Sequence, residues 1–295
     1  MPESSLLKSA RARNPRLRTV LTLLGASLVS VAGGLAITEL PIPTATSLPS
    51  GITAGPDGAV WFAEFGGNKI GRITTAGAIT EFPIPTADSG PALIGTGPDG
   101  AIWFAEFYGN KIGRITTAGT FNEFPVPTLD SGPYAVAAGP DDNLWFTESE
   151  ANKIGRITTG GVVTEFPIPT PESDPYVLAA GPDGNLWFTE SEANKIGRIT
   201  TAGVITEFPI PTPDSQPRGI TAGPDGNVWF TELAGDRIGR ITTAGVMTEF
   251  PIPTAGSEPL RITAGPDGNL WFTERSGNKI GRVTVARRSL VVPFR

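Results

Sequence analysis

The sequence predicts an all-β protein that folds as a β-propeller of six four-stranded blades. First, a Gly-Pro-Asp turn recurs every 42 residues, a period typical of repeat architectures. Second, a tryptophan follows each turn glycine by six residues, and a glutamate follows each tryptophan by three. Third, 37 glycines and 29 prolines among 295 residues make the chain turn too often to be mostly helical. The six turn glycines are Gly55, Gly97, Gly139, Gly181, Gly223 and Gly265.

Each unit contains four extended segments, and the fifth copy illustrates them. The first, Gly219–Gly223, has mainly small side chains, and the second, Asn227–Glu232, contains aromatic ones. The third, Arg237–Thr243, alternates between polar and apolar side chains, and the fourth, Val246–Pro253, ends in prolines. A Pro-Asp-Gly turn follows the first segment and a Thr-Ala-Gly turn follows the third. We therefore expect one antiparallel four-stranded meander in each unit.

Such a sheet cannot be stable alone, because it is apolar on both faces. Trp229 and Phe230 are adjacent in one strand, so their side chains point to opposite faces and both need cover. Radial stacking of the copies provides that cover and leaves only short outer edges. Pro251 and Pro253 suit an outer edge strand, and the small first segment suits the crowded centre.

The two ends of the chain suggest how the ring closes. Thr38–Thr44 repeats the outer-strand sequence in register with Thr80–Thr86, but it precedes the first complete unit. We expect this N-terminal strand to complete the last blade, whose own repeat decays after Thr284. The alternative is that Leu290–Phe294 supplies the fourth strand.

The first 36 residues differ from the rest in composition. Five basic residues precede Val20, and a weakly apolar segment, Val20–Ala36, ends in small residues. This order is typical of a secretory signal peptide, although an uncleaved anchor also fits. We expect residues 1–36 to be a signal peptide or anchor, residues 37–295 to be the propeller, and the protein to be exported, periplasmic or extracellular.

Composition excludes several classes of function. The chain has no cysteine, so disulfides and thiolate metal sites are excluded. It has no histidine either, which removes the commonest general base near neutral pH and the commonest nitrogen ligand of metals. After residue 36 there are 18 basic and 28 acidic residues, a balance that argues against nucleic acid and anionic membranes as partners. We expect contact with a membrane only through an uncleaved leader.

Differences between the copies are concentrated at one rim of the predicted propeller. The first-to-second and third-to-fourth turns hardly vary, whereas the second-to-third loops and the connections between blades do. Drift of exposed loops would also produce such variation. We favour a recognition surface, because aromatic and arginine side chains near a channel mouth are typical binding groups. The candidate ligand-binding residues are Tyr108, Tyr134, Tyr176, Arg218, Arg261 and Arg275.

The glutamates that follow the tryptophans could be interpreted as a ring of metal ligands. We expect them instead to pair with basic residues across the hairpin between the second and third strands, as Glu64 would with Lys69 and Glu148 with Lys153. The Gly-Pro-Asp turns lack the ligand spacing of a calcium loop and the lysine of a phosphate loop.

The combined motif G-I-T-A-G-P-D-G-N-x-W-F-T-E, N-K-I-G-R-I-T-T-x-G and T-E-F-P-I-P-T resembles the streptogramin B lyases, the virginiamycin B lyase family. The resemblance covers residues 38–284. It implies a seven-bladed propeller, where six units are present here. It also implies a magnesium-dependent elimination that opens a cyclic depsipeptide antibiotic at its ester bond without water.

The residues at the family's functional positions differ from the family pattern. The resemblance places the general-base histidine after Glu258-Pro259, where this chain has Leu260, and a second histidine at Arg218. It makes Glu258 a magnesium ligand and places a second one near Glu274. Elimination needs a base whose pKa lies near the working pH, and Glu258 meets this condition only if burial raises its pKa.

Three functions remain open at this point. We favour an exported, monomeric, non-catalytic protein that binds a small molecule, a peptide or a cell-surface partner at its variable rim. In that case no cofactor and no catalytic residue are expected. The alternatives are a divergent streptogramin B lyase with magnesium at Glu258 and Glu274, which would confer antibiotic resistance, and a purely structural surface propeller.

Overall fold

The computed structural model describes residues 28–32 and 35–285. The chain forms two compact units, Met1–Ala45 and Thr46–Arg295. The first contains a two-stranded antiparallel hairpin of β1 (Leu28–Ala32) and β2 (Leu35–Glu39). Most of the predicted leader lies outside the described residues. Among those that are described, no helix has the length and apolar character needed to cross a membrane.

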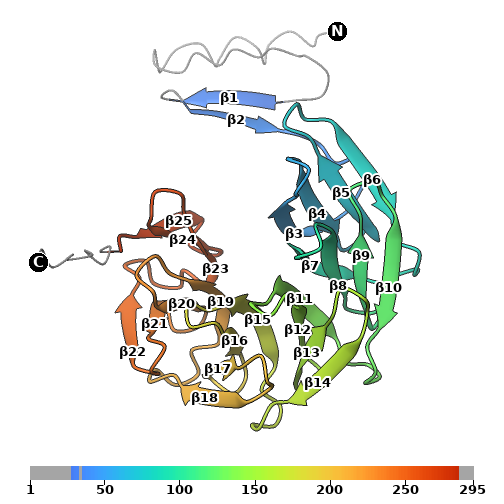
Figure 1. The fold of residues 1–295 in the computed structure, drawn as a ribbon. Coiled ribbons are helices and arrows are strands. Elements are labelled where there is room, and N and C mark those ends of the chain that lie inside the picture. The colour runs from blue at the N-terminus through green and yellow to red at the C-terminus, as the bar shows by residue number, and fades with distance from the viewer. Residues whose placement is uncertain (1–27, 33–34, 286–295) are drawn as a thin grey trace, which may run out of the picture. The chain divides into compact units, whose positions relative to one another are not determined.

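The second unit is the predicted propeller of six blades, which follow one another in chain order around a common centre (Figure 1). The inner strands are β3 (Pro49–Ala54), β7 (Pro91–Thr96), β11 (Pro133–Ala138), β15 (Pro175–Ala180), β19 (Pro217–Ala222) and β23 (Pro259–Ala264). The second strands are β4 (Val60–Glu64), β8 (Ile102–Glu106), β12 (Leu144–Glu148), β16 (Leu186–Glu190), β20 (Val228–Glu232) and β24 (Leu270–Glu274). The third strands are β5 (Lys69–Ile73), β9 (Lys111–Ile115), β13 (Lys153–Ile157), β17 (Lys195–Ile199), β21 (Arg237–Ile241) and β25 (Lys279–Val283). The outer strands are β6 (Ile79–Pro83), β10 (Phe121–Pro125), β14 (Val163–Pro167), β18 (Ile205–Pro209) and β22 (Met247–Pro251).

The strands of each blade pair in sequence order, which confirms the predicted antiparallel meander. In the third blade, for example, Trp145 lies opposite Arg156, and Phe146 lies opposite Gly155. Each outer strand that the structure describes ends at a proline, as expected where a missing N–H harms no ladder. The small inner strands line the centre, which is also as predicted.

In the part of the chain that the structure describes, the hydrophobic core consists of five clusters, one between each pair of successive blades. In the cluster between the third and fourth blades, Trp145, Ile154 and Ile168 of the third blade pack on Leu186 and Phe188 of the fourth. We call the first set the Trp face of a blade and the second the Phe face of the next. The other four clusters also pair a tryptophan of one blade with a phenylalanine of the next. The tryptophan and the phenylalanine of one second strand therefore belong to different clusters, as the alternation of the strand predicts.

Two further contacts hold each tryptophan of the first five blades. The Trp145 ring stacks on Phe166 of the outer strand, with centroids 5.5 Å apart and planes inclined by 19°. Its indole N–H donates to Asp141 Oδ1 over 2.9 Å, which satisfies the only polar atom of the side chain. The Gly-Pro-Asp turn is thus an anchor for the tryptophan as well as a turn.

The end of the ring differs from the sequence-based expectation. In the described residues the last blade has three strands, β23, β24 and β25, and Thr38 and Glu39 pair with Val29 and Leu28 of β1. Thr38 and Glu39 are thus paired within the first unit, and the closure of the last blade by residues 38–44 stays a prediction. A hairpin between neighbouring segments closes a much shorter loop than pairing with the opposite end of the chain, so it costs less entropy. The alternative strand, Leu290–Phe294, lies outside the described residues.

Gly155 in the third strand is predicted to be indispensable for packing. A Cβ atom built on it would lie 2.0 Å from Cζ of Phe146, whose ring covers the glycine within the sheet. We expect Gly155→Ala to lower the free energy of unfolding by about 1–3 kcal/mol, the usual cost of overpacking. Gly160→Ala is the matched control, since its Cβ would meet only Thr158 Oγ1, at 3.7 Å. Urea denaturation of both variants is the measurement, and equal midpoints would contradict the prediction.

Candidate functional site

The candidate site is built on a β-bulge at the start of each inner strand. In the third blade the register with the second strand shifts between Pro133 and Val136, and Tyr134 lies within this bulge. The same shift in the following three blades contains Tyr176, Arg218 and Arg261. A bulge bends its strand and re-aims a side chain. All four side chains are half-buried, and the contacts below bring them together.

Asparagines in the second-to-third turns fix where these inner strands begin. Asn152 has a positive φ of 58°, and its Oδ1 accepts hydrogen bonds from the backbone N–H and the hydroxyl of Ser173, at 2.8 and 2.6 Å. Its amide donates to the carbonyl of Thr170 over 2.8 Å. Ser173 lies three residues before Tyr176, so each blade holds the start of the next inner strand in place.

Two tyrosines and two arginines form one cluster. Tyr134 and Tyr176 stack with ring centroids 4.5 Å apart, and their hydroxyls are 2.7 Å apart. The guanidinium carbon of Arg218 lies 4.5 Å from the centroid of the Tyr176 ring, and that of Arg261 lies 5.5 Å from it. Arg261 also donates from Nη2 to the Tyr134 hydroxyl, at 3.5 Å. Tyr176 is therefore in contact with both cations and with the second ring.

The two arginines differ in how far their charge is neutralised. Arg218 Nη1 lies 3.7 Å from Asp174 Oδ2. Arg261 forms no salt bridge within the described part of the chain, and it reaches the space between the inner strands. Burial, together with hydrogen bonding to Tyr176, raises the pKa of Tyr134 to about 12, so this phenol keeps its proton at neutral pH. The cluster thus offers one positive charge that is available to an anionic or carbonyl group.

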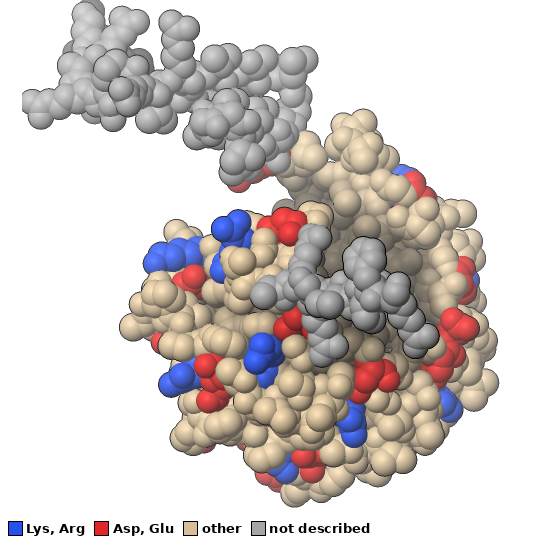
Figure 2. Space-filling view, turned by 60° about the vertical axis from the view of Figure 1, so that its left-hand side comes forward, with Lys and Arg blue, Asp and Glu red and all other residues tan. Residues whose placement is uncertain are grey.

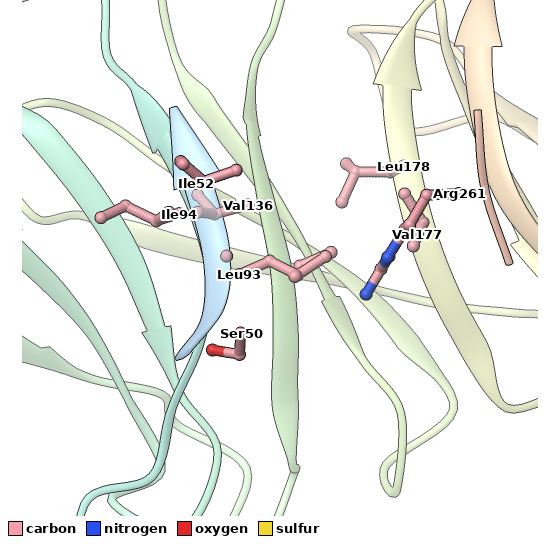
Figure 3. A pocket seen from close by; sticks show the side chains of 10 residues that line it. Ser50, Ile52, Leu93, Ile94, Val136, Val177, Leu178 and Arg261 are labelled. Atoms are coloured by element: carbon pink, nitrogen blue, oxygen red, sulfur yellow. The ribbon is translucent and has the colours of Figure 1, made fainter. Parts of the chain in front are cut away.

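Next to this cluster lies a cavity of about 240 Å³ between the inner strands. Figure 3 shows Leu93 and Arg261 extending toward the same space from different inner strands, with Val177 beside Arg261. Most of its lining is apolar, and among the described residues that line it the Arg261 guanidinium is the only charged group. Such a combination of apolar walls and one directed polar group is typical of small-ligand sites.

Tyr108 is connected to the cluster through a second aromatic contact. Phe107 contacts Tyr108 edge-on at 5.1 Å and Tyr134 at 6.3 Å between centroids, and Tyr108 in turn contacts Phe65. Tyr108 is 68% exposed, so its ring is available at the rim. Phe107 belongs to the predicted variable rim but not to the predicted ligand-binding residues, and Leu93 and Val177 belong to neither set. Leu93, Val177 and Arg261 occupy the same position of different repeats. The residue type at this position varies from repeat to repeat, and this variation could have identified them in the sequence.

Arg275 lies apart from the other candidates. Its Nη2 and Nε are 2.6 and 2.9 Å from Glu258 Oε2, and the Ser276 hydroxyl donates to the same oxygen over 2.7 Å. These hydrogen bonds from Ser276 and Arg275 hold the pKa of Glu258 below its usual value. The shift is opposite to the one that a general base would need, so the structure gives Glu258 no base function.

The donor set around Glu258 and Glu274 does not fit a magnesium site. Arg275 already neutralises Glu258, and Glu274 is buried, with one carboxylate oxygen that has no hydrogen bond. In the described residues no three acidic side chains come together in a way that could hold a metal ion. Mg²⁺ binds through carboxylates and ordered waters in near-octahedral geometry, and a guanidinium beside one of two carboxylates opposes this arrangement. The metal assignment of the two glutamates stays a prediction.

The glutamates at the ends of the second strands pair differently from the expectation. Glu148 lies opposite Lys153 in register, but the lysine ammonium binds Glu165 of the outer strand, 3.0 Å away. The same outer-strand pairing occurs for Lys69, Lys111 and Lys195. The predicted cross-hairpin pairs are therefore wrong. An ammonium is less costly near the outer edge, where it keeps contact with water, than in the interior beside Glu148.

As a result, buried carboxyl groups remain without hydrogen-bond partners. Glu148 is fully buried, and within the described residues neither of its carboxyl oxygens makes a hydrogen bond. Burial, and then the charge of Glu165, raises the pKa of Glu148 to about 8, against the opposing effect of Lys153. Burial is also the main cause of the raised pKa values of the equivalent glutamates in four other blades, Glu64, Glu106, Glu190 and Glu232.

Comparison with known proteins gives matches along most of the chain. The profile of the virginiamycin B lyase family matches residues 35–291. A solved virginiamycin B lyase from Staphylococcus aureus is 48% identical, with a TM-score of 0.81, over 83% of this chain and 84% of that chain. A catalytically inactive variant of the S. aureus lyase, in which alanine replaces a histidine, was solved with quinupristin. It is 46% identical, with a TM-score of 0.81, over 84% and 85% of the two chains. A streptogramin B lyase is 40% identical, with a TM-score of 0.77, over 83% and 85%.

The buried glutamates predict a stability that decreases as the pH rises from about 4.5 to about 8. The folded-state pKa of Glu148, about 8, lies above its ordinary value of 4.5, so the folded state binds more protons between these values. Its stabilising contribution is complete below pH 4.5 and is lost as the pH rises through about 8. One such group changes the free energy of unfolding by up to about 1.4 kcal/mol per pH unit. Chemical denaturation between pH 5 and 9 should give a shallower pH dependence for Glu148→Gln than for the wild type, and identical slopes would refute this.

Proposed function

Because the chain belongs to the virginiamycin B lyase family, we propose that it is a lyase-like binding protein. It holds a small-molecule or peptide ligand at the cluster of Tyr134, Tyr176, Arg218 and Arg261 and does not catalyse elimination. The observation that carries this proposal is the absence of histidine from all six repeats of a chain that matches the family over residues 35–291. The relative in which one histidine is replaced by alanine is described as catalytically inactive, and it was solved with quinupristin. Loss of the histidine is thus compatible with ligand binding in this family.

The side chains of the cluster support binding better than proton transfer. An elimination needs a group that accepts a proton near neutral pH. Tyr134 keeps its proton, with a pKa of about 12, and the pKa of Glu258 is lowered. Leu260, at the position where the resemblance places the general base, has no titratable group. Burial raises the pKa of Asp174, but its carboxylate pairs with Arg218.

The geometry favours a ligand with two chemical parts. The stacked tyrosines and the exposed Tyr108 offer aromatic surfaces, and the cavity beside Leu93 offers apolar walls. The Arg261 guanidinium can donate to a carbonyl or carboxylate oxygen of the same ligand. A compact molecule with aromatic or apolar groups and such an oxygen, including a cyclic peptide, meets both conditions.

The charge distribution supports a small ligand over nucleic acid. Figure 2 shows acidic and basic side chains interspersed on one face of the molecule, without a large patch of one sign. The whole chain has a net charge of −6, and its body is more acidic than the leader. Export, which would place such a protein outside the cytoplasm, belongs to the proposal and depends only on the leader sequence.

A divergent streptogramin B lyase is the second candidate, and family membership is the observation that favours it. It would need magnesium at Glu258 and Glu274, where the donor set does not fit. We expect no linear product when the purified chain is incubated with quinupristin and Mg²⁺ and followed by mass spectrometry. A histidine-containing lyase from S. aureus is the positive control. Ring-opened product that disappears in Glu258→Ala would establish the lyase instead.

Binding is tested separately from catalysis, with quinupristin as the probe. We expect measurable binding by isothermal titration calorimetry, weakened about tenfold or more in Arg261→Ala and in Tyr176→Leu, because each removes a direct contact group. Arg275→Ala is the matched control, since its guanidinium already pairs with Glu258 away from the cluster. Equal losses in all three variants would contradict the assigned position of the site. No binding of quinupristin, or of any partner found, would favour a purely structural propeller.

A further inference from the structure

The first and last blades each leave one apolar face uncovered, and Ile52 on the first of these faces also lines the cavity of the proposed ligand site. Ile52 in β3 is 72% exposed, while the residues at its repeat position in the other five blades are 5–8% exposed. Ile280 in β25 is 65% exposed, while its five equivalents are 0–2% exposed. The two outliers are therefore the two ends of the series of blades.

Other residues on these two faces are also more exposed than their equivalents in the internal blades. Val60 and Ile73 on the Phe face of the first blade are half-buried, whereas the equivalent residues of the second to fifth blades are fully buried. Trp271 on the Trp face of the last blade is also half-buried, in contrast to the other five tryptophans. A cavity of about 240 Å³ lies over Trp271, Phe272 and Ile280 on that blade.

The five internal interfaces show what covers such faces. In every one, the Trp face of one blade packs on the Phe face of the next. The uncovered face of the first blade is a Phe face and that of the last blade is a Trp face. Since the repeats are nearly identical, the uncovered Trp face of the last blade is complementary to the uncovered Phe face of the first. Such a pair of faces already forms each of the five internal interfaces.

We propose that the two end faces join different copies of this chain, with the Trp face of one copy packed on the Phe face of a second. Both faces are exposed at once within one chain, so its own two ends do not cover each other. The contact is heterologous, because two different surfaces meet, and it therefore builds closed rings of copies or open chains of them. This differs from the monomer that the sequence analysis expected.

The unpaired edge of β25 adds to the same contact. In the first five blades the third strand pairs with an outer strand, whereas in the described residues β25 pairs only with β24. An unpaired edge with free N–H and C=O groups readily accepts another strand. A second copy seated on this blade could therefore add backbone hydrogen bonds to the apolar contact.

The test uses the purified full chain and two variants that each block one end. By light scattering coupled to size exclusion, the wild type should have a mass above that of one chain, and this mass should increase with concentration. Ile52→Asp and Ile280→Asp should each weaken self-association at least tenfold. Val204→Asp is the control, because Val204 is also exposed, at 62%, but lies away from both end faces. It should behave as the wild type.

Mixing the two blocked variants provides the decisive measurement. Ile52→Asp keeps an intact Trp face and Ile280→Asp keeps an intact Phe face, so an equimolar mixture should form a dimer with one copy of each and nothing larger. Circular dichroism confirms that both variants are folded. A wild type that is monomeric at all concentrations would overturn the proposal and point to cover by residues 38–44 or 286–295 of the same chain. Folded variants that do not combine would overturn it equally.

Discussion

Packing of the Trp face of one blade on the Phe face of the next is the interaction on which the rest of this structure depends. No blade has a core of its own, because its tryptophan and its phenylalanine lie on opposite sides of the same sheet. Burial of these side chains between blades is therefore both the driving force for folding and the reason for the order of the ring. It also explains why Gly155 and its equivalents cannot have a side chain, since a phenylalanine ring occupies that space.

The candidate site uses the part of each blade that this packing leaves free. At the bulges that begin the inner strands, one or two residues per blade do not follow the alternation of side chains between the two faces of the sheet. Tyr176 and Arg261 occupy such positions. Asn152 and its equivalents form side-chain hydrogen bonds to the connections between blades, just before the inner strands. The variable residues are therefore attached to a backbone that is held in the same way in each blade. Aromatic stacking and two cations then gather at one end of the centre.

The chemistry of the family and the chemistry of this chain differ in their titratable groups. The scaffold is that of the virginiamycin B lyase family, but the chain has no histidine. The remaining acidic candidate, Glu258, is neutralised by Arg275 and Ser276. The unusual carboxyl groups, such as Glu148, lie inside the blades and have no access to a ligand at the rim. A change in the titratable groups of the site is thus compatible with the same fold, because the clusters between blades consist of apolar side chains, with Tyr134 packed against one of them.

The sequence by itself determined the number of blades, the strand order and the buried residues, because a 42-residue repeat with alternating side chains leaves few other ways to cover both faces. It also identified Tyr134, Tyr176, Arg218 and Arg261 as members of a variable rim. Only the tertiary structure decided which of them touch, because the bulges that aim them have no signature in the repeat. It also decided that Lys153 pairs with Glu165 and not with Glu148, and that Arg275 pairs with Glu258. Periodicity specifies the face on which a residue lies, but the choice between two partners on one face depends on distances and water access that exist only in the folded molecule.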